Sequence, residues 1–285
     1  MPVWRLLNSG RGDGVFNMAV DETLLAHPGP RPVLRLYSWD PPAISLGHAQ
    51  DPSREVDVEK CRVAGLDLVR RPTGGRAVLH WDELTYSIIC RQDDAALGGC
   101  TEDTYCRIGH CLVEGLRGLG VAAELERTRP RPVSPRSAGI AAPCFSSTAR
   151  WEVKYKGRKL VGSAQRRTRG AILQHGSLPL GAHYRRLPEF LPEAMQHLRP
   201  LMARQLEQGS IHLRACMGRE VEWGELVANI CEGLRRHLGV EFESDQLDGE
   251  EKRRIAALVR LRRSDMTPVD LGAAAESEGQ HLVSI

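Results

Sequence analysis

The sequence predicts an α+β fold in which mixed or antiparallel β-sheets are flanked by helices. Short apolar runs bounded by Gly and Pro turns, which are typical of strands, fill the first two-thirds of the chain. Helical apolar periodicity prevails in the last third, and this segregation of strands from helices favours α+β. The 285 residues suffice for one large domain with a sizeable core.

One helix and a series of strands account for most of the first two-thirds. Residues 8–14 are rich in Gly and predict a turn. Phe16, Val20 and Leu24 then recur at helical spacing, and this helix must end before Pro28. Further strands are predicted at residues 33–37, 43–47, 68–71, 76–80, 84–90, 152–155, 158–164 and 171–178.

Four more helices follow from apolar periodicity and glycine stop signals. The last of them is basic and is expected to turn Ile255, Leu258 and Leu261 inward. Residues 127–143 are rich in Pro and Arg and predict an irregular basic loop. The helices are predicted at residues 57–64, 101–119, 223–238 and 252–263.

Charge and hydropathy exclude some classes of function. The net charge of +3 predicts no strong affinity for nucleic acid. No apolar run approaches the roughly 18 residues of a membrane helix, and the N-terminus lacks the apolar segment of a signal peptide. We therefore expect a cytoplasmic protein with no membrane partner.

The cysteines of a cytoplasmic protein are expected to be reduced thiols. Cys100, Cys106, His110 and Cys111 are an alternative set of metal ligands. No Cys-x-x-Cys pair is present, however, and a helix explains the spacing of Cys106 and Cys111, so we expect no metal site. Five cysteines in or beside apolar periodic segments are expected to be small core residues, namely Cys61, Cys90, Cys111, Cys216 and Cys231.

Cys144 and Lys159 are the strongest candidates for chemistry. Cys144 follows Pro143 in a polar loop, and Lys159 follows the turn Lys156-Gly157. A cation near a thiol lowers its pKa and yields the nucleophilic thiolate of an acyl-transfer site. The alternatives are a loop thiol without a role and a solvent-facing lysine. Strand alternation places Lys159 on the same face as Val161 and Ser163, and this face enters a cavity if it points inward.

Glycine-rich and histidine-bearing segments supply candidates for binding. Gly74-Gly75 among arginines suits a carboxylate or phosphate, and the alternative is a tight hairpin between two strands. The small residues 162–164 leave room for a chain-like ligand. His80 and His175 are candidate bases or, alternatively, hydrogen-bonded core histidines.

Four blocks of this sequence, in this order, resemble the biotin/lipoate protein ligase superfamily. They read Arg-Pro-Thr-Gly-Gly-Arg-Ala-Val-Leu-His (71–80), Glu-Leu-Thr-Tyr-Ser (83–87), Gly-Arg-Lys-Leu-Val-Gly-Ser-Ala-Gln (157–165) and Leu-Gln-His-Gly (173–176). Asn-Met-Ala-Val-Asp-Glu (17–22) fits the same superfamily. Ordered blocks are far more specific than one motif. The resemblance implies the superfamily's catalytic domain over residues 1–250 and a C-terminal helical extension over 251–285.

Cys144 distinguishes two branches of this superfamily. ATP-dependent lipoate ligases activate the acid as an adenylate and need no cysteine. One branch of octanoyltransferases carries a cysteine after proline, upstream of the Gly-Arg-Lys strand, as this chain does. Arg76 follows the glycine pair where ligases usually carry a third glycine. Trp81, between His80 and Asp82, departs from the usual His-Asp pair.

The resemblance therefore implies octanoyl transfer in lipoate biosynthesis, without a cofactor. The implied donor is octanoyl-acyl carrier protein, and the implied acceptor is a lysine of a lipoyl domain, on the glycine-cleavage H protein or a 2-oxoacid dehydrogenase E2 subunit. Cys144 and Lys159 are the implied catalytic residues. The implied substrate-binding residues are Arg71, Thr73, Gly74, Gly75, Arg76, His80, Gly162, Ser163, Ala164, Gln165, His175 and Gly176.

Two other hypotheses stay open. The chain is an ATP-dependent lipoate or octanoate ligase in which Cys144 is incidental, or it is an acyl-binding protein without enzymatic activity. ATP-dependent attachment of free acid indicates the first, and binding of octanoyl carrier without an acyl-enzyme indicates the second.

Overall fold

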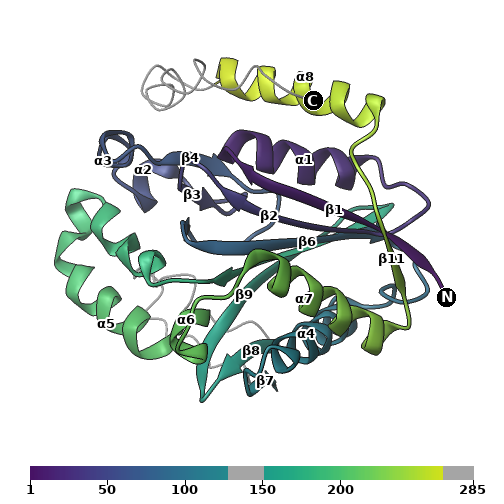
Figure 1. The fold of residues 1–285 in the computed structure, drawn as a ribbon. Helices are drawn as coiled ribbons and strands as arrows, with labels where there is room; N and C mark the ends of the chain where they lie inside the picture. The colour runs from purple at the N-terminus through teal and green to yellow at the C-terminus, as the bar shows by residue number, and fades with distance from the viewer. Residues whose placement is uncertain (128–150, 266–285) are drawn as a thin grey trace.

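The computed structural model describes residues 1–127 and 151–265 and is organised around an eight-stranded mixed sheet (Figure 1). A second sheet has three strands in the order β4 (Asp67–Arg70), β3 (Ala43–Leu46), β5 (Val78–His80). In spatial order the large sheet holds β11 (Glu241–Ser244), β1 (Val3–Gly12), β2 (Val33–Trp39), β6 (Glu83–Arg91), β10 (Ala171–Pro179), β9 (Arg158–Arg167), β8 (Trp151–Tyr155) and β7 (Ala123–Arg127).

Helices flank both faces of the large sheet, and the predicted α+β class is confirmed (Figure 1). The α-helices are α1 (Gly14–Ala26), α2 (Pro52–Glu55), α3 (Val58–Val63), α4 (Thr101–Gly118), α5 (Arg199–Gly209), α6 (Leu213–Met217), α7 (Trp223–Leu238) and α8 (Gly249–Asp265). Two 3-10 helices, η3 (His183–Phe190) and η4 (Glu193–Leu198), precede α5.

The N-terminal segment corrects one prediction. Residues 8–12 belong to β1, which pairs in parallel with β2 and with β11, and they do not form a turn. The pairing register shifts between Asn8 and Gly10, and Gly10 has φ +64°, which indicates a β-bulge. The Gly-rich composition thus reflects a bulged strand. Parallel strands need a crossover connection, and α1 supplies it between β1 and β2.

Strict alternation along β6 separates the apolar core from the polar interior. Leu84, Tyr86 and Ile88 face the cluster formed with α4 and α7. The intervening residues Glu83, Thr85 and Ser87 are also buried but polar, and they face the opposite side of the sheet. Because both faces of β6 are covered, its polar side chains must find partners inside the protein.

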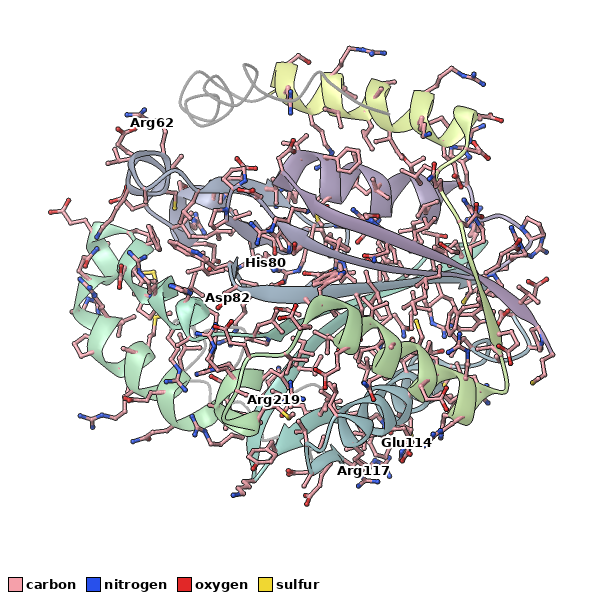
Figure 2. The ribbon with its side chains drawn as sticks, in the orientation of Figure 1. Arg62, His80, Asp82, Glu114, Arg117 and Arg219 are labelled. Carbon is pink, nitrogen blue, oxygen red and sulfur yellow. The ribbon has the colours of Figure 1, made fainter. Side chains whose placement is uncertain are left out.

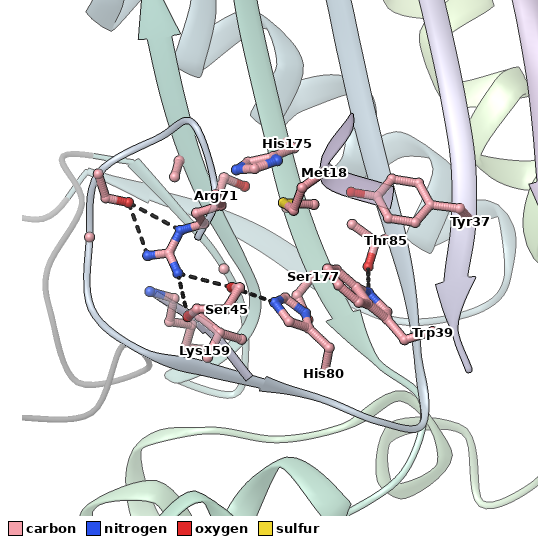
Figure 3. A pocket seen from close by; sticks show the side chains of 17 residues that line it. Met18, Tyr37, Trp39, Ser45, Arg71, His80, Thr85, Lys159, His175 and Ser177 are labelled. Carbon is pink, nitrogen blue, oxygen red and sulfur yellow. Dashed lines mark hydrogen bonds between the residues drawn. The ribbon is translucent and has the colours of Figure 1, made fainter. Parts of the chain in front are cut away.

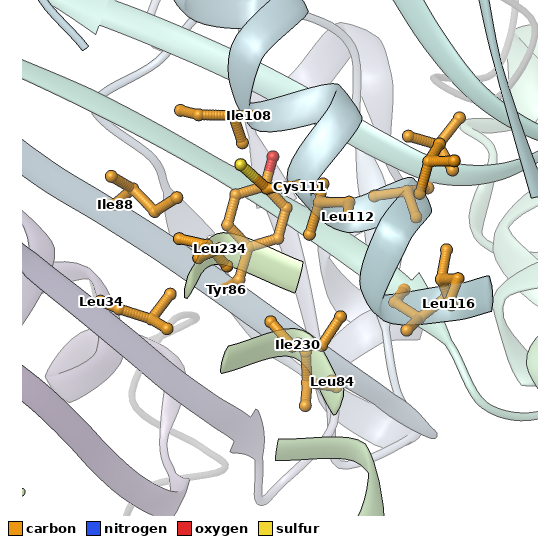
Figure 4. Close-up of a cluster of buried hydrophobic side chains, with 14 of the residues drawn as sticks. Leu34, Leu84, Tyr86, Ile88, Ile108, Cys111, Leu112, Leu116, Ile230 and Leu234 are labelled. Carbon is orange, nitrogen blue, oxygen red and sulfur yellow. The ribbon is translucent and has the colours of Figure 1, made fainter. Parts of the chain in front are cut away.

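The apolar face of the sheet packs against α4 and α7 (Figure 4). The two helices approach closely at glycines, since a Cβ on Gly233 would lie 2.2 Å from the Cys111 carbonyl oxygen. Each fully buried aliphatic side chain in this cluster stabilises the fold by about 1.5–3 kcal/mol. The cluster includes Leu34, Ile108, Leu112, Leu116, Ile230 and Leu234.

On the other face, α8 lies over α1 (Figure 1). Ile255 is buried and Leu258 partly so, as predicted, but Leu261 is 56% exposed, so that part of the prediction was wrong. At 3.6 residues per turn the buried stripe runs from Ile255 to Arg262, which binds Glu22 of α1 at 2.6 Å. The division of the chain at residue 250 stays a prediction.

Arg62, Glu114 and Arg117 lie at the periphery, whereas His80 lies inside (Figure 2). Arg62 pairs with Glu59 and Arg117 with Glu114 within their own helices, and such exposed pairs contribute little to stability. The described residues contain no helix that is both long and apolar enough to span a membrane.

Candidate active site

A cavity lies between the two sheets and is lined by residues from both (Figure 3). Lys159 and Arg71 lie at one end of it, and Tyr37 and Trp39 lie at the other. Its remaining lining residues are Met18, Ser45, Gly74, Gly75, Val78, His80, Thr85, Gly162, Ser163, Ala164, His175, Gly176 and Ser177. The structure thus brings together ten of the residues singled out in the sequence, although their roles stay predictions.

Small residues on β9 and β10 create the space. Gly176 stands opposite Ser163 in the ladder, and a Cβ on Gly176 would lie 2.5 Å from the Tyr86 ring and 2.7 Å from the Gly162 carbonyl oxygen. Any larger residue at 176 would therefore force the sheet apart. Gln165, next on β9, does not line the cavity and donates instead to Gln174 Oε1 at 2.9 Å.

Lys159 is buried at the cavity, with only 5% of its surface exposed, so it is not a solvent-facing lysine. Its Nζ lies 3.1 Å from Glu152 Oε1, and Glu152 is buried as well. Sequence reasoning missed Glu152. The register of the hairpin could have indicated it. Lys154 stands opposite Lys159, and Glu152 lies two residues before Lys154 on the same strand face, within reach of Lys159.

His175 joins the buried face of α1 to the Gly74-Gly75 loop. Its Nδ1 lies 3.2 Å from Asp21 Oδ2 and its Nε2 2.6 Å from the Thr73 hydroxyl. A carboxylate only accepts, so Nδ1 carries the proton and Nε2 accepts from Thr73. Burial lowers the pKa of His175, and the hydrogen bond and charge of Asp21 oppose this shift.

Asp21 is the centre of this buried network. It accepts hydrogen bonds from Arg35 at 2.8 Å, Tyr37 at 3.1 Å and Ser87 at 2.6 Å, besides the bond from His175. Burial by itself raises the pKa of Asp21, but the hydrogen bond from His175 and the charge of Arg35 outweigh it and hold the pKa below its ordinary value. Asp21 is a site residue that sequence reasoning did not single out.

His80 forms a second histidine–carboxylate pair at the cavity. Its Nδ1 donates to Glu83 Oε1 at 2.7 Å, and its Nε2 accepts from the Ser45 hydroxyl at 2.7 Å. Glu83 also accepts from Thr85 and Ser177. Both histidines line the cavity with each ring nitrogen in a hydrogen bond, which agrees with the alternative of hydrogen-bonded core histidines.

Arg71 shapes the glycine loop. Its guanidinium donates to the carbonyl oxygens of Ser45 at 2.9 Å, Gly74 at 3.0 Å and Arg76 at 2.7 Å. These bonds favour a role in holding the loop over direct binding of an anion. Arg76 itself is half-buried and does not line the cavity.

The hairpin alternative for Gly74-Gly75 was wrong. β4 and β5, which flank the loop, pair on opposite sides of β3 rather than with each other. The loop passes the end of β3 so closely that a Cβ on Gly47, the residue after this strand, would lie 2.1 Å from the Gly75 carbonyl oxygen. Gly75 has φ +101°, which only glycine adopts without strain.

Cys144 and the basic segment 128–143 lie outside the described residues. None of the cysteines in residues 1–127 and 151–265 lines the cavity. Four of the five predicted core cysteines are buried, and Cys216 is half-buried. Burial raises the pKa of Cys61 and Cys90 to about 12 and that of Cys216 and Cys231 to about 11, so these thiols stay protonated at neutral pH.

The alternative metal ligands do not converge. Cys111 is buried in the core, Cys100 caps α4, and His110 stacks on His237 at a centroid distance of 5.2 Å. Across the described part of the chain, no group of three or more His, Cys, Asp or Glu side chains is arranged to hold a metal ion.

Comparison with known proteins identifies the family. The family model of the lipoyl protein ligase A/B catalytic domain matches residues 13–235. The chain belongs to this family. It is 40% identical over 255 residues to octanoyltransferase LipM of Kyrpidia tusciae, covering 88% of this chain and 93% of that protein. Octanoyltransferase LipM of Bacillus subtilis is 33% identical and covers 87% of this chain and 91% of its own length. The predicted resemblance is confirmed.

Solved structures of lipoyl protein ligases share the fold. A lipoate-protein ligase A bound with ATP is 22% identical with a TM-score of 0.73, covering 96% of this chain and 100% of that chain. A bi-partite lipoate protein ligase from Thermoplasma acidophilum is 22% identical with a TM-score of 0.75, covering 96% and 97%. At these identities the likeness concerns the fold, and it agrees with the predicted catalytic-domain architecture.

Proposed function

We propose that this chain transfers an octanoyl group from acyl carrier protein to a lysine of a lipoyl domain, through a thioester on Cys144. The relatives named octanoyltransferase confirm octanoyl transfer in lipoate biosynthesis as the activity. The cysteine, the donor and the acceptor are this proposal. The observation that supports it most is the buried cation Lys159 at one end of a cavity whose other end is aromatic.

Cys144 is the nucleophile that the chain offers to this site. The cysteines of the described residues lie away from the cavity, and burial keeps most of them protonated. Cys144 stands 15 positions before Lys159 in the sequence, in the block whose resemblance identifies the octanoyltransferase branch. An ordinary thiol has a pKa of about 8.5, and a nearby ammonium favours its thiolate.

Lys159 stabilises negative charge where the chemistry occurs. The Cys144 thiolate attacks the octanoyl carbonyl carbon, the bond from that carbon to the carrier sulfur breaks, and the carrier leaves as a thiol after taking up a proton. The ammonium of Lys159 faces the developing oxyanion in each step. Glu152, at 3.1 Å, fixes the position of the ammonium. Backbone N–H groups of residues 162–165 are further candidate donors to this oxygen.

The acceptor amine completes the reaction. A neutral lysine ε-amine attacks the thioester carbonyl, the bond to Cys144 breaks, and the amine gives up a proton as the amide forms. Thioester to amide is downhill, so the transfer needs no ATP. The octanoyl tail extends along Met18, Val78 and Tyr37 and gains about 0.8 kcal/mol for each buried methylene. Gly74 and Gly75 on the loop and small residues of β9 and β10 enclose it.

Intact-mass spectrometry of the enzyme tests this proposal. Incubation with octanoyl carrier and no acceptor is expected to add the mass of one octanoyl group to the wild type and to Cys100→Ser, an exposed-cysteine control. Cys144→Ala is expected to stay unmodified and to lose turnover. Undiminished turnover by Cys144→Ala would contradict the thioester. Acylation of the acceptor from free octanoate only with ATP would instead identify a ligase.

A further inference from the structure

We propose that Trp39, stacked on His80, closes the far end of the acyl cavity and sets the longest acyl chain that the enzyme accepts. This inference rests on the proposed function, because it takes the cavity as the acyl site. Lys159 marks the reacting end of the cavity, and the indole of Trp39 lies at the opposite end (Figure 3). A chain that grows from the carbonyl therefore ends against this ring.

Trp39 also lines a second hollow. Glu83, which supports the wall of the acyl cavity, lines this hollow as well. The remaining residues of the hollow do not line the acyl cavity. Trp39 thus lines both spaces, and we take its indole as the wall between them. The other residues of this outer hollow are Gly10, Arg11, Ser38, Asp40, Pro42, Trp81, Asp82, Leu180, His183 and Trp223.

Hydrogen bonds and stacking hold the partition in place. Trp39 Nε1 donates to the Thr85 hydroxyl at 2.8 Å, and its ring stacks on His80 with centroids 4.1 Å apart and planes 13° from parallel. Thr85 and His80 in turn both donate to Glu83, at 2.6 Å and 2.7 Å. One carboxylate therefore anchors both rings, and the indole is only 5% exposed. Such a fixed wall limits length, whereas a mobile side chain would yield to a longer substrate.

The two spaces differ in what they offer an acyl chain. The cavity side presents Met18, Tyr37 and Val78, where each added methylene improves binding about fourfold. The outer hollow mixes charged groups such as Arg11 and Asp82 with apolar ones such as Trp81, Leu180 and Trp223. Removing the indole opens a path for a longer chain into this hollow and also admits water to the thioester.

The test compares octanoyl and dodecanoyl carriers as donors for the wild type, Trp39→Ala and Trp39→Phe. Trp39→Ala is expected to raise the ratio of kcat/KM for dodecanoyl over octanoyl at least about tenfold, since part of the added chain becomes buried. Trp39→Phe, which keeps a ring but loses the bond to Thr85, is expected to raise the ratio by a smaller factor. Hydrolysis of the acyl-enzyme without acceptor is expected to rise in Trp39→Ala.

Trp223→Ala is the matched control, because Trp223 lines the outer hollow only. It is expected to leave the chain-length ratio of the wild type unchanged. If both Trp39 variants keep the wild-type ratio of kcat/KM for the two donors, or lose activity equally with both, Trp39 does not limit the chain length. If Trp39→Ala does not fold, the Phe variant alone decides. A wild type that accepts no acyl group from either carrier would refute the proposed function instead.

Discussion

The two faces of the large sheet are built in different ways. Towards α4 and α7, β6 presents Leu84, Tyr86 and Ile88 to an apolar cluster. Towards the cavity it presents Glu83, Thr85 and Ser87. Thr85 donates to Glu83 within the strand, and the other partners, Trp39, His80 and Asp21, lie on other elements. An apolar face gains stability from area and adapts to small changes. A buried polar face is stable only while each charge keeps its partner. The side chains at the cavity are therefore held in fixed positions, but this face tolerates few substitutions.

The largest expected effect on stability comes from replacing Asp21, the centre of the buried polar network. Asp21→Asn removes the charge that Arg35, also fully buried, pairs with at 2.8 Å. An uncompensated buried arginine is expected to lower the free energy of unfolding by about 3–5 kcal/mol in chemical denaturation. Asp93→Asn is the control, since Asp93 pairs with Arg91 at the surface, and no measurable change is expected. Equal stability of the two variants would refute the contrast between buried and exposed pairs.

Truncating a side chain in the apolar core is expected to lower the free energy of unfolding somewhat less. Leu116→Ala removes a fully buried side chain and is expected to lower the free energy of unfolding by about 2–5 kcal/mol. Octanoyl transfer by the folded enzyme is expected to be unchanged, because Leu116 lies across the sheet from the cavity. Leu261→Ala, at an exposed position, serves as the control. A loss of transfer in Leu116→Ala at full folding would show that the two faces are coupled.

Beside Lys159, Glu152→Gln is expected to reduce activity and also stability, because it takes the carboxylate away from a buried ammonium. The amide cannot hold the Lys159 ammonium as the carboxylate does at 3.1 Å, and misplacing a catalytic group costs about ten- to a hundredfold in kcat. KM for the acyl carrier is expected to stay constant. Glu126→Gln, which removes the half-exposed partner of Lys154, is the matched control. Similar kinetics in both variants would argue that Glu152 is only structural.

The smallest expected effect is a change of stability with pH, which arises only from titratable groups on the polar face. Burial lowers the pKa of His175 below 6.5, so the unfolded chain takes up its proton first as the pH falls. Stability from this group is complete above pH 6.5 and is lost below it, by at most about 1.4 kcal/mol per pH unit. The lowered pKa of Asp21 adds a further loss below pH 3.8. Denaturation of His175→Asn is expected to show a flatter dependence between pH 6.5 and 5 than that of Leu116→Ala.

The same contrast explains which features the sequence could predict. Apolar periodicity identified α4 and α7 to within a few residues because it depends on local spacing. Alternation placed Lys159 and Val161 on one face of the strand but left open whether that face points inward, and both side chains are buried. The small residues of β9 and β10 were found because a strand interior rarely tolerates them without a reason.

The polar partners were beyond this reasoning because they come from distant parts of the chain. Asp21 and His175 are 154 positions apart, and Glu83 binds Ser177 across the sheet. The pattern around Asp21 is an ordinary helix, and nothing local marks its carboxylate as buried. The Gly74-Gly75 loop was compatible with a hairpin until the sheet order placed β3 between its flanking strands.

The central claim, that Lys159 activates Cys144 at the cavity, is tested most directly by thiol alkylation. Iodoacetamide labelling of the Cys144 peptide is followed by mass spectrometry over a range of pH in the wild type and in Lys159→Met. We expect the labelling midpoint of the wild type to lie below the ordinary thiol value of about 8.5 and to rise in the variant. Identical midpoints in the two proteins would contradict the account.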